Sequence, residues 1–208
     1  MNQTIHNAAL LNQTGAAYLA SNQPERAQKC FKTALEYVTH SGDGNMQDIP
    51  SSNALRQPLP ASISGDSDDN YIYTKPFFFN PAASMTEEEI APFGAVILFN
   101  LALSYHEQAK ITGDSDLKVA MALYEKCLNL LRRHSNFDCS NIIIAALHNQ
   151  AKICEELCHF AQAGQKFLLL STLLEQDEIR TDTIEPDDLN AVCLNIYFFK
   201  FPTCAPVA

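Results

Sequence analysis

The chain has 208 residues, 47% of them hydrophobic, with only 7 Gly and 10 Pro; this composition suits a helical protein with a substantial core. Its formal net charge of −10 disfavours nucleic acids and anionic membrane surfaces as general partners, since no basic patch is available to displace their counterions. No stretch approaches the ~20 apolar residues of a membrane-spanning helix, and the first residues have neither the positive charge nor the apolar run of a secretory signal. Seven irregularly spaced Cys fit free thiols in a reducing compartment, so we expect an intracellular protein, cytoplasmic or nuclear.

Residues 5–41 are predicted to form a hairpin of two helices. Six residues carry the pattern, three on each helix at spacing i, i+4, i+7, which places each triplet on one face of its helix. They are Leu11, Gly15, Tyr18, Ala27, Phe31 and Ala34. The small residues let the two helix backbones approach, and the large ones fill the space between them. Pro24 disfavours a helical conformation at Gln23 and so places the turn between the two helices.

Residues 42–94 leave this pattern and form a long irregular insert. Residues 42–70 are rich in Ser, Asp, Pro and Gly and are expected to be disordered. In residues 71–79, by contrast, five of nine side chains are aromatic, and the stretch favours an extended conformation. We expect it to pack on the repeat helices, because burying a large apolar side chain is worth about 1.5–3 kcal/mol; the alternative is an exposed strip that binds a partner.

The hairpin pattern returns twice, at residues 95–134 and 141–177. In the second hairpin it falls on Leu98, Ala102, Tyr105, Ala120, Tyr124 and Cys127, and in the third on Leu147, Ala151, Cys154, Ala163, Phe167 and Leu170. Asp114–Asp116 and Ser140 are expected to cap the helices that follow them. A last helix at 186–200 opens with Pro and two Asp, a typical first turn, and is expected to cover the apolar edge of the final hairpin.

These three units resemble the tetratricopeptide repeat (TPR), whose helix–turn–helix unit carries the same alternation of small and large residues. The resemblance covers about half of the chain. Leu stands in all three units where the family has its leading Trp, and the closing Pro is absent. The resemblance implies an all-α fold: a right-handed superhelix of three TPR-like helical hairpins plus a C-terminal capping helix, with a long irregular insert after the first hairpin.

In proteins of this family the first helix of each hairpin lines a concave surface that holds a peptide. Counting from the packing triplets, the residues implied on that face are Asn12, Leu19, Phe99, Leu103, His106, His148, Lys152 and Glu155. The family's carboxylate clamp uses Lys, Arg and Asn here, and this chain offers only Lys152 and Asn12, so an acidic chain terminus is not the expected ligand. The middle of the groove is apolar and suits an aromatic or aliphatic peptide, such as the chain's own residues 71–79.

Residues that could carry chemistry are better explained by packing. Cys154 and Cys158 lie at i, i+4 with His148 and His159 nearby, but one helix cannot close a tetrahedral metal site, and Cys154 occupies a packing position. No phosphate-binding loop, dinucleotide fingerprint or nucleophile turn is present in the sequence. We therefore expect no catalytic residue, metal or cofactor. The sequence favours a non-catalytic protein–protein interaction module, an adaptor or scaffold; the alternative is a self-closed structural or regulatory subunit whose aromatic insert occupies the groove.

Overall fold

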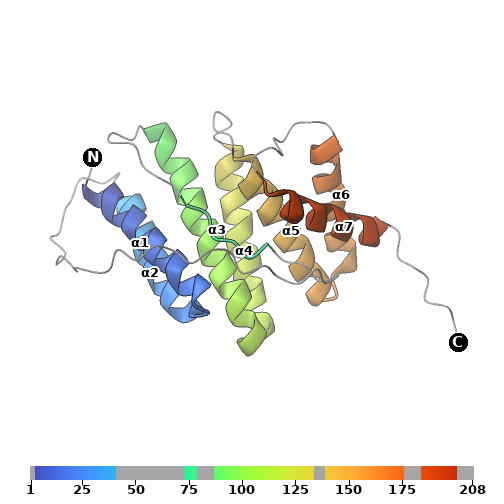
Figure 1. The fold of residues 1–208 in the computed structure, drawn as a ribbon, viewed down its shortest axis with the longest axis horizontal. Helices are drawn as coiled ribbons and strands as arrows, with labels where there is room; N and C mark the ends of the chain where they lie inside the picture. Colours follow the sequence, from blue (N-terminus) through green and yellow to red (C-terminus); the bar gives the residue numbers. More distant parts are fainter. Residues whose placement is uncertain (1–2, 41–72, 79–86, 134–138, 176–183, 201–208) are drawn as a thin grey trace, which may run out of the picture.

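The computed structural model describes residues 3–40, 73–78, 87–133, 139–175 and 184–200, and the regular structure in these ranges is entirely helical (Figure 1). The helices are α1 (Gln3–Ala20), α2 (Pro24–His40), α3 (Glu87–Thr112), α4 (Asp114–Arg132), α5 (Ser140–Glu156), α6 (Phe160–Glu175) and α7 (Pro186–Lys200). The all-α prediction is confirmed for this part of the chain, and each expected helix is present within a few residues of its expected bounds. None of these helices combines the length and the apolar character needed to cross a membrane. The disorder expected at 42–70 falls outside the described residues.

The helices pack chiefly on their neighbours in sequence. The most extensive contacts join α3 to α4 and α1 to α2; those of α2 with α3 and of α5 with α6 come next and are similar in extent, followed by those of α4 with α5. The result is a row of helix pairs in chain order, with α7 lying against α6 at the C-terminal end (Figure 1).

The first pair is held by a glycine facing a phenylalanine. Phe31 of α2 is fully buried, and a Cβ atom added to Gly15 of α1 would lie 2.5 Å from its ring atom Cε1. The turn between the helices contains Asn22 at φ 54°, a left-handed conformation that Asn tolerates, and Pro24 starts α2. Gly15 and Phe31, both predicted to lie between the two helices, thus face each other across the pair.

The other two pairs share one hydrophobic core. Ala102 on α3 and Tyr124 on α4 are both fully buried in it, as are Ala151 on α5 and Phe167 on α6. A second cluster joins α1 and α2 to the same helix α3 through Phe93, Ile97 and other apolar residues. Helix α3 therefore contributes to both clusters and connects the first pair to the rest.

Two helix starts differ from the sequence prediction. Asp114–Asp116 do not cap α4, because α4 already begins at Asp114 and these residues form its first turn, where their charges suit the helix dipole. Only Gly113 separates α3 from α4, and its φ of 87° makes this sharp reversal possible without an Asp cap. Ser140 is likewise the first helical residue of α5, and the residue before it is Cys139.

We expect Gly15→Ala to lower the free energy of unfolding by about 1–3 kcal/mol, because the added methyl group would overlap the Phe31 ring. Gly94→Ala in α3 is the matched control, since its Cβ would lie 3.4 Å from Leu130 Cδ2, an ordinary contact. The control should leave stability unchanged or raise it by up to about 1 kcal/mol through helix propensity. Urea unfolding followed by circular dichroism measures both, and equal effects would contradict the glycine–aromatic contact.

Candidate functional site

The most distinctive feature of the structure is a short segment, residues 73–78, that is neither helix nor strand and lies against α1, α3 and α5 (Figure 1). Its first residue, Tyr73, contacts α5, and Phe77 contacts α3 and α1. The segment therefore crosses the helix pairs in the reverse of their sequence order. We call the side chains that hold it the segment site, which consists of Asn12, Phe99, Asn100, Asn149 and Asp188.

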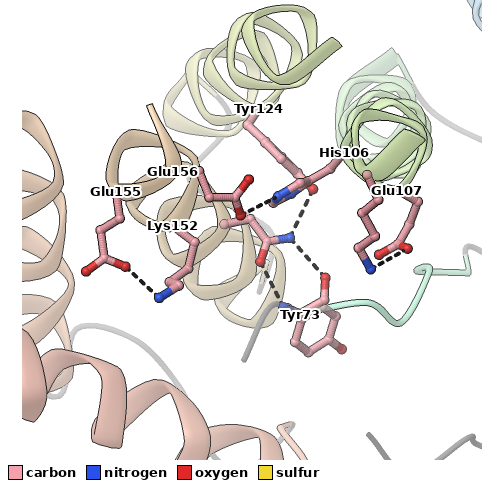
Figure 2. Close-up of polar contacts among 9 residues, drawn as sticks. Tyr73, His106, Glu107, Tyr124, Lys152, Glu155 and Glu156 are labelled. Carbon is pink, nitrogen blue, oxygen red and sulfur yellow. Dashed lines mark hydrogen bonds and ion pairs between the residues drawn. The ribbon is translucent and has the colours of Figure 1, made fainter. Parts of the chain in front are cut away.

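Asn149 of α5 grips both peptide groups of Tyr73. Its Oδ1 accepts the Tyr73 N–H at 2.9 Å, and its Nδ2 donates to the Tyr73 carbonyl at 2.9 Å. The same Nδ2 donates to the hydroxyl of Tyr124 on α4 at 2.9 Å, so the amide lies between the two tyrosines (Figure 2). Asn149 is fully buried, and its side-chain oxygen and nitrogen both have partners. The orientation of this amide is thus set from both sides.

Asn100 of α3 grips Phe77 in the same way. Its Oδ1 accepts the Phe77 N–H at 2.8 Å, and its Nδ2 donates to the Phe77 carbonyl at 2.7 Å. Its Nδ2 also donates to Oδ1 of Asn12 on α1 at 2.9 Å. The Nδ2 of Asn12 in turn donates to the Phe77 carbonyl at 3.3 Å. Asn100 and Asn12 are both buried. The bonds to Phe77 involve only its main-chain N–H and C=O, so they do not depend on the identity of its side chain.

The two amide grips occupy equivalent places in two hairpins. Asn100 follows the leading Leu98 of the second hairpin by two positions, and Asn149 follows Leu147 of the third by two positions. Tyr73, held by Asn149, and Phe77, held by Asn100, are four residues apart. One hairpin step along the row therefore corresponds to four residues of the segment.

Aromatic packing supplies the apolar part of the site. The rings of Tyr73 and Phe77 stack at 5.3 Å with planes 9° apart. Both meet Phe99 edge-on, at centroid distances of 6.2 and 4.8 Å, and Phe99 in turn contacts Tyr124 at 5.3 Å. Phe78, the next residue, is exposed. Aromatic identity therefore matters at positions 73 and 77, where such pairs add to the burial energy.

An ion pair holds the middle of the segment. Lys75 Nζ lies 2.7 Å from Oδ2 of Asp188, in the first turn of α7. The Asp188 side chain is 8% exposed and that of Lys75 is 42% exposed. Burial, followed by the charges of Asp188 and of Glu185, raises the pKa of the Tyr73 hydroxyl. The acidic start of α7 thus forms one rim of the segment site.

The residues expected on the binding face divide into two groups. Asn12 and Phe99 contact the segment directly. The remainder lie elsewhere: Leu19 is partly buried between the two cores, Leu103, His106, His148 and Lys152 are buried, and Glu155 pairs with Lys152. The expected set omitted Asn100 and Asn149, each of which makes two hydrogen bonds to the main chain of the segment. They share a position two residues after the leading Leu of their hairpins, but the packing pattern did not distinguish that position from its neighbours.

Three of these buried residues, His106, His148 and Lys152, have polar contacts of their own. Nε2 of His106 lies 3.6 Å from Oε1 of Glu156, and Lys152 pairs with Glu155 (Figure 2). The neighbouring His106 ring lowers the pKa of the Glu156 carboxyl, against the effect of burial. The amide nitrogen of Asn195 lies 2.9 Å from Nε2 of His148, an arrangement in which the amide donates to a neutral imidazole.

The cysteine and histidine residues considered for metal binding do not converge. Cys154 is buried with its Sγ 3.8 Å from Met121 Sδ, whereas Cys158 and His159 are exposed in the turn after α5. Among the described residues, no three His, Cys, Asp or Glu side chains form a group that could hold a metal ion.

No protein-family model matches the chain, and no curated protein or solved structure shows significant similarity to it.

We expect Asn149→Ala to lower the free energy of unfolding by about 2–4 kcal/mol. It removes three hydrogen bonds and leaves buried polar atoms of Tyr73 and Tyr124 without that partner. The matched control is Asn129→Ala, which removes an exposed amide that bonds Glu125 on the same helix and should change stability by less than about 0.5 kcal/mol. Chemical unfolding compares the two variants. A similar effect from both would mean that the Asn149 grip contributes nothing beyond an exposed amide.

We also expect stability to fall between about pH 6.5 and pH 4, in part because of His148. Burial, and then the charge of Lys152, lowers the pKa of His148 from 6.5 to about 3. The unfolded chain therefore binds this proton at a higher pH than the folded chain, and the free energy of unfolding decreases as the pH falls below 6.5. Near pH 5 the loss from this group is about 2 kcal/mol.

His148→Gln removes the titrating group and should flatten the pH dependence by about that amount. Urea unfolding near pH 7 and near pH 5 gives the difference for each protein. His159→Gln, which replaces an exposed histidine, serves as the control and should keep the wild-type slope. A wild-type slope in His148→Gln would show that this imidazole is not held neutral.

Proposed function

We propose that this protein is a non-catalytic protein–protein interaction module, an adaptor or scaffold, whose TPR-like hairpins form a right-handed superhelix that binds an extended segment on its concave face. In the free chain its own residues 73–78 occupy that face. The observation that supports this is the pair of buried amides, Asn100 and Asn149, each of which both accepts from and donates to one residue of the segment.

The polar character of these contacts favours a binding face over simple core packing. A buried amide costs free energy unless it is hydrogen-bonded, and both of these amides meet that requirement with the N–H and C=O groups of the segment itself. Amides that grip the N–H and C=O of one residue recognise what every extended peptide offers, as in other modes of peptide binding through the main chain. The free cysteines Cys30, Cys127, Cys139, Cys154, Cys158 and Cys193 suit a reducing compartment, which we propose is the cytosol or nucleus.

A second candidate function is that of a self-closed structural or regulatory subunit. The packing of the stacked Tyr73 and Phe77 rings against Phe99, and the ion pair of Lys75 with Asp188, favour permanent occupation by the chain's own segment. The two candidates differ in one property: whether the segment can leave while the helices stay folded.

Hydrogen exchange of Phe77→Ala tests this difference. Loss of this half-buried ring removes about 1.5–3 kcal/mol of burial energy from the docked segment. The hydrogen-exchange rates of the Tyr73 and Phe77 amides should therefore rise by about tenfold to a hundredfold. Under the binding-module proposal, the amides in the cores of α3 and α5 keep their protection. The control is Phe78→Ala, which truncates an exposed ring of the same type and should change neither set of amides.

A parallel loss of protection in the segment and in α3 and α5 would contradict the binding-module proposal. It would mean that the segment is an integral part of the fold, as the structural-subunit alternative requires.

A further inference from the structure

We infer that the segment site receives, from a partner protein, an extended peptide with two aromatic residues four positions apart and a basic residue midway between them. Residues 73–77, Tyr-Thr-Lys-Pro-Phe, are the copy of this pattern that the chain itself carries. This inference rests on the proposed function and adds the chemistry of the ligand.

The aromatic spacing follows from the two amide grips. Asn149 fixes the main chain of the first residue and Asn100 that of the fifth. Both side chains lie on the same side of the segment, where their stacked rings make T-shaped contacts with Phe99. An aliphatic side chain would fill part of this space, but it would lose the edge-to-face contacts.

The basic residue in the middle follows from the acidic rim. Asp188, whose side chain is only 8% exposed, pairs with the third position, and the exposed residues Glu185 and Asp187 precede it in the chain. An acidic residue at the third position would place like charges together, and the net charge of −10 adds a general repulsion of acidic peptides. The rim thus selects a cation at this position.

The other positions are weakly specified. Thr74 and Phe78 are exposed, so their side chains carry little selectivity. The proline at the fourth position is compatible with the grips, because the two Asn side chains read the first and fifth residues only. Proline also favours an extended conformation at the residue before it, which reduces the entropy lost on binding.

Displacement of the chain's own segment is a competition between a tethered and a free ligand. A tethered segment has an effective concentration on the order of millimolar. The free peptide therefore binds the wild-type chain weakly and binds more tightly when the tethered copy is weakened, because a larger fraction of the sites is open.

The test uses the full chain and a fluorescent synthetic peptide of residues 70–80, with anisotropy as the readout. Tyr73→Ala/Phe77→Ala weakens the tethered copy and leaves Phe99 and the three asparagines in place. It should bind the peptide at least about tenfold more tightly than the wild-type chain. If the double variant is not helical by circular dichroism, Phe77→Ala replaces it with the same expectation.

Peptide variants test the pattern on the double-variant protein. Replacing both aromatic residues of the peptide, the counterparts of Tyr73 and Phe77, by Ala should reduce binding by about tenfold or more. Changing the counterpart of Lys75 to Glu should weaken binding by about threefold or more, and most of this difference should vanish on Asp188→Asn protein. A Phe-to-Ala change at the counterpart of exposed Phe78 is the matched control and should leave affinity unchanged.

Each contrary result has a distinct meaning. Equal binding of the peptide without its aromatic residues would overturn the inferred pattern but leave main-chain binding in place. Absence of binding to a folded, monomeric double variant would overturn the inference entirely. Dimers of the wild-type chain that exchange this segment, detected by sedimentation, would identify a second copy as the occupant and overturn the partner peptide. Failure of the proposed function itself is detected separately, by a loss of hydrogen-exchange protection in α3 and α5 when the segment is weakened by Phe77→Ala.

Discussion

The rest of the structure depends on one constraint: the N–H and C=O groups of a non-helical segment need hydrogen-bond partners where it lies on an apolar helical surface. A helix bonds its own N–H and C=O groups, whereas an extended segment brings unpaired ones with it. Asn100 and Asn149 supply a donor and an acceptor at two residues of the segment, and the rings of Tyr73 and Phe77 can then be buried against Phe99. Without the amides, burial of these rings would carry the cost of desolvating the peptide groups beside them.

The same amides connect the segment to the contacts between helix pairs. Asn149 also bonds Tyr124 across α4 and α5, and Asn100 also bonds Asn12 across α3 and α1. Occupation of the site is therefore coupled to helix packing at two places. A ligand that replaces the segment in the same register preserves both networks, because it offers identical main-chain atoms.

The central position of α3 and α5 explains why most residues expected on an open face are buried. His106, His148 and Lys152 are buried: His148 contacts Asn195 of α7, Lys152 pairs with Glu155, and His106 Nε2 lies 3.6 Å from Glu156 Oε1. A prediction that counts positions along one helix does not include the other elements that cover it. The neutral, buried state of His148 is a consequence of this coverage.

Local patterns in the sequence determined the helices and the contact within the first pair. The spacing of Gly15 and Phe31, and the turn before Pro24, depend on residues close together in the chain, and the structure has both. Tertiary structure alone decided which side chains hold residues 73–78. Successive positions on a helix differ in direction by about 100°, so the packing pattern did not distinguish Phe99 from Asn100. The bonds to Asn149 and Asn100 span 76 and 23 positions along the chain, and only the packed helices bring those groups together.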